Sequence, residues 1–91
     1  MRLRWTPAAA QDLEQIHDYL TEHQPQLAQS TIRELYEAVR SLRNSPRRGR
    51  LGREGGTREL ILGRLPYIVA YRVAQEDIEI LHIFHTARSR E

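Results

Sequence analysis

The first half of the chain carries apolar residues at helical spacing. A helix is predicted from Pro7 to about His23, because Thr6 is a good N-cap residue and proline is tolerated at the first helical position. A second helix is predicted to begin at Pro25 and to end at Asn44-Ser45-Pro46. Two apolar stripes support this helical hairpin. They are Ala9, Leu13, Ile16 and Leu20, and then Ala28, Ile32, Leu35, Val39 and Leu42.

Shorter apolar runs, rich in Ile, Val and Tyr, fill the second half of the chain. They predict a three-stranded antiparallel meander at about Arg58–Leu62, Tyr67–Val73 and Ile78–His85. Met1–Trp5 predicts one further short strand. The last run is expected to be covered on both faces and therefore to be the central strand. Its predicted faces are Ile78, Ile80 and Phe84 on one side, and Leu81 and Ile83 on the other.

These elements predict one α+β domain over residues 1–91, with an N-terminal strand, a helical hairpin and a three-stranded antiparallel meander. No apolar run approaches the roughly 20 residues of a membrane span, and the N-terminus lacks a secretory signal. We therefore expect a cytoplasmic protein without a membrane partner. The chain has no cysteine, and His82 and His85 should point to opposite faces of a strand. No metal site and no cofactor are predicted.

Positive charge is concentrated in residues 44–64. The net charge is only +2, and all 14 basic residues are arginine. Glycines among the arginines predict that Arg47–Thr57 is a flexible loop that does not bury itself. This segment suits either anion binding or simple solvation, and the uniform use of arginine fits either phosphate contacts or a coding bias. The arginines are Arg47, Arg48, Arg50, Arg53, Arg58 and Arg64.

Several motifs occur in a characteristic order. They are TPxAxxDLExIxxYL, SPxxGR, REL, Tyr67-x-x-x-Tyr71-x-Val73 and IxILHIFHTAR. This pattern resembles the RelE/ParE superfamily of type II toxin–antitoxin toxins over essentially the whole chain. The resemblance implies a small toxin that is neutralised by a cognate antitoxin, whose C-terminal segment wraps the toxin. RelE-type members cleave mRNA on the ribosome, whereas ParE-type members act on DNA gyrase.

The nuclease interpretation depends on a few residues at the end of the chain. RelE-type toxins cleave RNA largely with arginines and a C-terminal tyrosine. Ile68 replaces one family arginine, and only Ser89, Arg90 and Glu91 follow Arg88, so the tyrosine is absent. Arg88 matches another family arginine. His85 matches a histidine of some nuclease branches, where an imidazole can serve as acid or base. If the protein is a nuclease, the resemblance implies His85, Arg88 and Arg58 as catalytic residues.

The ending His85-Thr86-Ala87-Arg88 instead resembles the H-x-A-R ending of ParE-like members, as does the start of the first helix. We therefore predict a ParE-type toxin that binds DNA gyrase without catalysing a reaction. The alternatives are a ribosome-dependent mRNA endoribonuclease and a degenerate member that binds its antitoxin without being toxic. The predicted target-binding or nucleic-acid-binding residues are Arg47, Arg48, Arg50, Arg53, Arg58 and Arg88.

Overall fold

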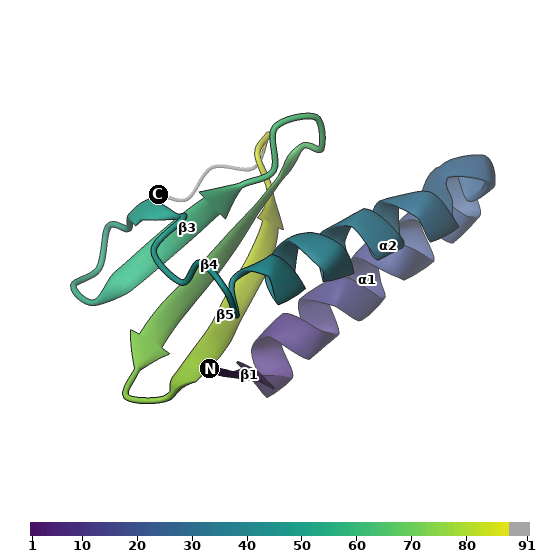
Figure 1. Cartoon of the computed structure of the whole chain (residues 1–91). Coiled ribbons are helices and arrows are strands. Elements are labelled where there is room, and N and C mark those ends of the chain that lie inside the picture. The colour runs from purple at the N-terminus through teal and green to yellow at the C-terminus, as the bar shows by residue number, and fades with distance from the viewer. Residues whose placement is uncertain (88–91) are drawn as a thin grey trace.

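The computed structural model describes residues 1–87, which form a helical hairpin on one face of a five-stranded sheet (Figure 1). The helices are α1 (Pro7–His23) and α2 (Pro25–Ser41). The strands are β1 (Arg2–Trp5), β2 (Arg50–Leu51), β3 (Thr57–Ile61), β4 (Tyr67–Ala74) and β5 (Asp77–His85). The predicted α+β class, the hairpin and the meander are confirmed.

Thr6 both starts α1 and attaches it to the sheet. Its hydroxyl accepts a hydrogen bond from the Ala9 N–H at 3.2 Å and donates one to the Ile80 carbonyl at 2.6 Å. Proline occupies the first turn of each helix, and only Gln24 separates the two. The local signals at Pro7 and Pro25 therefore define the hairpin, because both prolines are tolerated only where a helix begins.

The strand order is β1-β5-β4-β3-β2, with β1 parallel to β5 and the other pairs antiparallel. The expectation that the last strand is central was wrong, because β4 occupies the middle. The reason lies in the arginine-rich segment predicted as a loop. Two of its residues, Arg50 and Leu51, pair with β3 and extend the sheet on that side.

A β-bulge changes which residues of β5 face the core. Ile80 pairs with Tyr71, whereas His82 pairs with Ala70, so Leu81 is the extra residue of the bulge. An extra residue of this kind reverses the alternation of side chains beyond it. Ile83 therefore joins Ile78 and Ile80 in the core, and the predicted grouping of Phe84 with those two residues was wrong.

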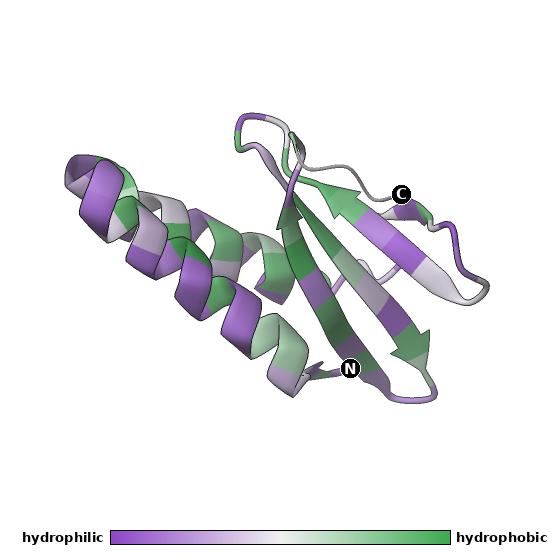
Figure 2. Ribbon diagram, turned by 180° about the vertical axis from the view of Figure 1, so that it is seen from behind, coloured by the Kyte–Doolittle hydropathy of each residue, from purple (hydrophilic) through white to green (hydrophobic). Residues whose placement is uncertain are grey.

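The hydrophobic core lies between the hairpin and the sheet. Figure 2 shows long hydrophobic stretches on β4 and β5, and a hydrophobic stripe on the helices that turns toward them. The largest fully buried side chains of the core are Leu35, Val39, Leu42, Val69, Tyr71, Ile78 and Ile80. Within residues 1–87, neither helix combines the length and apolar character needed to cross a membrane.

Candidate functional site

A groove of about 640 Å³ lies between the helical hairpin and the adjoining ends of β4 and β5. Tyr19 and Leu27 on its helical side remain 58% and 45% exposed, so the groove presents apolar surface to its surroundings. Concave apolar surface of this kind commonly binds a partner. The apolar lining residues are Ile16, Tyr19, Leu20, Leu27, Leu65, Tyr67, Ile83 and Phe84.

One edge of β5 faces this groove without a strand partner. Among residues 1–87, β1 pairs with β5 only as far as Ile80. Beyond that point, Asp12 of α1 substitutes for a strand, because its carboxylate accepts the Ile83 N–H at 2.9 Å. The same carboxylate lies 3.2 Å from Nδ1 of His82. His82 is exposed, with 60% of its side chain accessible.

His85 lines the groove at the end of β5. Its ring meets Tyr67 edge-on, with the ring centroids 5.3 Å apart. Nδ1 accepts a hydrogen bond of 3.0 Å from the Ala87 N–H, since a backbone N–H can only donate. Within residues 1–87, Nε2 of His85 therefore has no hydrogen-bond partner, and the ring packs against a tyrosine of the adjacent strand.

Arg58 holds the segment before β2 against the sheet. Its guanidinium donates to the Gly49 carbonyl at 2.7 Å. Beside it, the Tyr71 hydroxyl donates to the Pro46 carbonyl at 2.7 Å and accepts the Gly49 N–H at 2.9 Å. Gly49 itself is buried, so the expectation that this segment does not bury itself was wrong at this residue. These contacts position the loop that carries Arg47 and its neighbours.

The other predicted arginines differ in what they contact. Arg50 donates to the buried carboxylate of Glu59, with its Nη2 at 3.0 Å. Arg48 donates to the Ser41 hydroxyl at the end of α2. The side chains of Arg47 and Arg53 are exposed. Arg88 lies outside the described residues.

Arg58 and His85 do not converge on one point. They flank β4 on opposite sides, where Arg58 pairs with Tyr71 and His85 pairs with Tyr67. Four residues of a strand span about 13 Å, and the Arg58 guanidinium is directed to Gly49. Within residues 1–87, no group of three or more His, Asp or Glu side chains is arranged to hold a metal ion.

Comparison with known proteins identifies the family. Residues 3–90 match the sequence model of the ParE toxin of the type II toxin–antitoxin system parDE. The chain belongs to the ParE toxin family. As a type II toxin of this family, it has an antitoxin as its partner.

Known relatives of this ParE-family toxin share most of its length. Toxin RelE2 of Caulobacter vibrioides is 39% identical over 84 residues, which cover 92% of this chain and 93% of the relative. A structure of the chromosomal ParDE system from P. aeruginosa matches with a TM-score of 0.86 and 33% identity, over 93% of this chain and 95% of the other. The isolated E. coli RelE toxin shares the fold, with a TM-score of 0.70 and 16% identity, over 98% and 87% of the two chains.

The sequence analysis of this ParE-family toxin did not identify two residues with structural roles. Asp12 falls in the TPxAxxDLE motif, but its contact with β5 depends on how α1 lies across the sheet. Gly49 was assigned only a general role in loop flexibility. A side chain at this position would collide with Tyr71, which is 22 positions away in the chain, so only glycine fits.

Proposed function

We propose that this ParE-family toxin inhibits DNA gyrase by binding to it, without catalysing RNA cleavage. The observation that carries the proposal is the separation of the groups that a nuclease must bring together. Cleavage of RNA without a metal requires a base for the 2′-hydroxyl, cations at the phosphorane and an acid for the leaving oxygen, all at one phosphate. Arg58 is bound to a loop carbonyl, whereas His85 lies at the far end of β4.

Ile68 supports the same proposal. By resemblance, RelE-type toxins carry an arginine at the position of Ile68. Ile68 itself is buried, with 7% exposure. It pairs with Ile61 on one side and Phe84 on the other, so its surroundings are apolar. Ile61, Ile68 and Phe84 are neighbours across three strands, and none of them has a charge that could bind a phosphate. The 33% identical match to a ParDE system favours the same choice.

The antitoxin is proposed to occupy the groove beside α1. An apolar segment of the antitoxin would cover Tyr19 and Leu27, the exposed apolar residues of this wall. Its backbone would extend the free edge of β5 next to Asp12, which already accepts one N–H from that edge. Helix-in-groove binding and strand addition are both established modes of peptide recognition.

Two assays on the same preparation test the gyrase proposal. A titration of the purified toxin should inhibit supercoiling by gyrase in a gel assay, and pre-incubation with antitoxin should abolish the inhibition. Primer extension on mRNA from a translating extract should show no new 5′ ends. Codon-positioned cleavage with normal supercoiling would refute the proposal and would support the endoribonuclease alternative. Inactivity in both assays would also refute it, in favour of the non-toxic alternative.

A further inference from the structure

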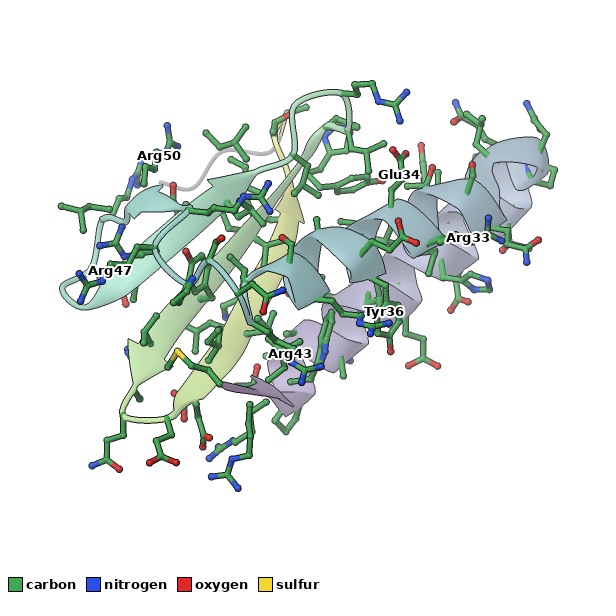
Figure 3. The ribbon with its side chains drawn as sticks, viewed as in Figure 1. Arg33, Glu34, Tyr36, Arg43, Arg47 and Arg50 are labelled. Atoms are coloured by element: carbon green, nitrogen blue, oxygen red, sulfur yellow. The ribbon has the colours of Figure 1, made fainter. Side chains whose placement is uncertain are left out.

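The exposed side of α2 carries a row of arginines that is separate from the groove. Arg33 and Arg40 are exposed on one flank of the helix, and the exposed Arg43 follows in the turn after it. Figure 3 shows Arg33 and Tyr36 along α2, with Arg43 just past the C-terminal end of the helix and Arg47 farther along the chain. The groove is lined by other α2 residues, Leu27 and Thr31. The two surfaces can therefore be occupied at the same time.

Among the residues that the structure describes, these arginines lack the acidic partners that Arg2, Arg64 and Arg72 have. Within residues 1–87, the guanidinium groups of Arg33, Arg40, Arg43 and Arg47 form no hydrogen bond or ion pair. By contrast, Arg2 pairs with Asp77, Arg64 with Glu34, and Arg72 with Glu79. Among the described residues of this flank of α2, Glu37 is the one carboxylate, so positive charge prevails there.

The aromatic residue of this flank is already engaged. The Tyr36 ring lies 5.5 Å from the ring of Trp5, and Trp5 packs against the core. Recognition of single-stranded nucleic acid depends on aromatic faces on which bases stack. Part of the Tyr36 ring surface is therefore taken up by Trp5. Tyr36 remains 47% exposed, so the flank offers one partly covered ring rather than the several rings on which successive bases stack.

We propose that Arg33, Arg40, Arg43 and Arg47, which we name the α2 arginine track, bind the phosphates of double-stranded DNA. The helical rise separates Arg33 from Arg40 by about 10 Å, and Arg43 and Arg47 follow beyond the end of α2, so several phosphates of a duplex are within reach of these long side chains. The guanidinium group forms paired hydrogen bonds to phosphate. Because phosphates carry no base identity, binding is independent of sequence.

The track extends the proposed function without depending on it. Gyrase acts on duplex DNA, so a toxin that contacts both the enzyme and its DNA would bind the complex more tightly than either component. DNA binding by the track is measured without gyrase. A toxin that binds DNA but does not inhibit supercoiling would refute the proposed function alone, and the opposite result would refute only the track.

The test compares two triple variants with the same loss of charge. R33Q/R40Q/R43Q removes three of the four arginines of the track, and R2Q/R64Q/R72Q removes three arginines that have acidic partners. Exposed ion pairs contribute little to stability, so the control should remain folded. Each full-length protein is titrated into a fluorescent 20-base-pair duplex of arbitrary sequence, and anisotropy is recorded over a range of salt concentrations.

The track variant should bind the duplex at least about 10-fold more weakly than the unsubstituted toxin at low salt. The slope of log K against log salt should fall by about 0.9 for each phosphate that the variant no longer binds, or about 2.7 for the triple variant. The control variant should bind the duplex within about twofold of the affinity of the unsubstituted toxin. Equal weakening in both variants, or tighter binding of an RNA hairpin than of the duplex, would refute the proposal. The single variants R33Q and R40Q, each expected to lower the slope by about 0.9, give the same answer if the triple variant does not fold.

Discussion

Replacing Gly49 with alanine should strongly destabilise this ParE-family toxin. Gly49 is buried beneath Tyr71, whose hydroxyl accepts the Gly49 N–H at 2.9 Å. A Cβ at this position would lie 2.8 Å from Cε1 and the hydroxyl oxygen of Tyr71, and 2.9 Å from the carbonyl oxygen of Glu59. Neither the ring nor the backbone of β3 can move away without disrupting its own packing. The strain must therefore be relieved by lifting the loop off the sheet.

The expected decrease in stability is the sum of two effects. Overpacking of a tight site typically costs about 1–3 kcal/mol. If the loop lifts, the hydrogen bond between Gly49 and Tyr71 breaks at a further cost of about 1 kcal/mol. The free energy of unfolding should therefore fall by about 2–4 kcal/mol, a large share of the stability of a small domain. With a urea m-value of about 2 kcal/mol per M, the midpoint should fall by about 1–2 M.

Gly55 provides the matched control. A Cβ at Gly55 would meet no atom within 4 Å, and the residue lies in the same loop. Gly55→Ala should therefore leave the urea midpoint unchanged or raise it slightly, because alanine restricts the unfolded chain. Both variants are compared by urea unfolding followed by circular dichroism. If Gly49→Ala and Gly55→Ala unfold within about 0.5 kcal/mol of each other, the proposed packing of Gly49 under Tyr71 is incorrect.

Three further substitutions test other parts of the account. Leu27→Arg should weaken antitoxin binding by at least about 10-fold in calorimetry, because it places a charge in the apolar groove, whereas Leu51→Arg on the 76% exposed Leu51 should change it little. His85→Ala should leave inhibition of supercoiling within about twofold, since a binding toxin needs no acid or base. If His85→Ala instead slowed mRNA cleavage in a translating extract by about 100-fold, catalysis would be favoured. Asp12→Ala should lower the free energy of unfolding by about 1–2 kcal/mol, because the Ile83 N–H loses its acceptor, and an unchanged urea midpoint would argue against that role.

The sequence predicted the parts of the fold that short-range signals determine. Thr6-Pro7 and Pro25 mark the starts of the helices locally, and α1 runs from Pro7 to His23 as expected. The bulge at Leu81 was not predicted, because apolar residues at both Ile80 and Leu81 fit a strand covered on both faces, and the extra residue is defined only by its pairing with β4. The two-residue strand β2 was missed for a similar reason, since its pairing with Arg58 and Glu59 leaves no periodic pattern.

The candidate site was less predictable than the fold. Charge alone grouped the arginines of residues 44–64, but the structure divides them by their contacts. Arg58 bonds to a loop carbonyl and Arg50 to a buried carboxylate, whereas the guanidinium of Arg47 has no partner within residues 1–87. The arginines of α2 were not selected from the sequence, because the predicted helix places Arg33 and Arg40 on one flank without showing that they lack acidic partners within residues 1–87. The contacts of each arginine depend on residues distant in the chain, which the sequence alone does not identify.

The central claim, that this toxin acts on gyrase rather than on the ribosome, is tested most directly by partition. Labelled toxin is mixed with equal concentrations of purified gyrase and ribosomes, and the two particles are separated by sedimentation. We predict that the toxin co-sediments with gyrase and that stoichiometric antitoxin removes it. Co-sedimentation with ribosomes, and none with gyrase, would contradict the claim.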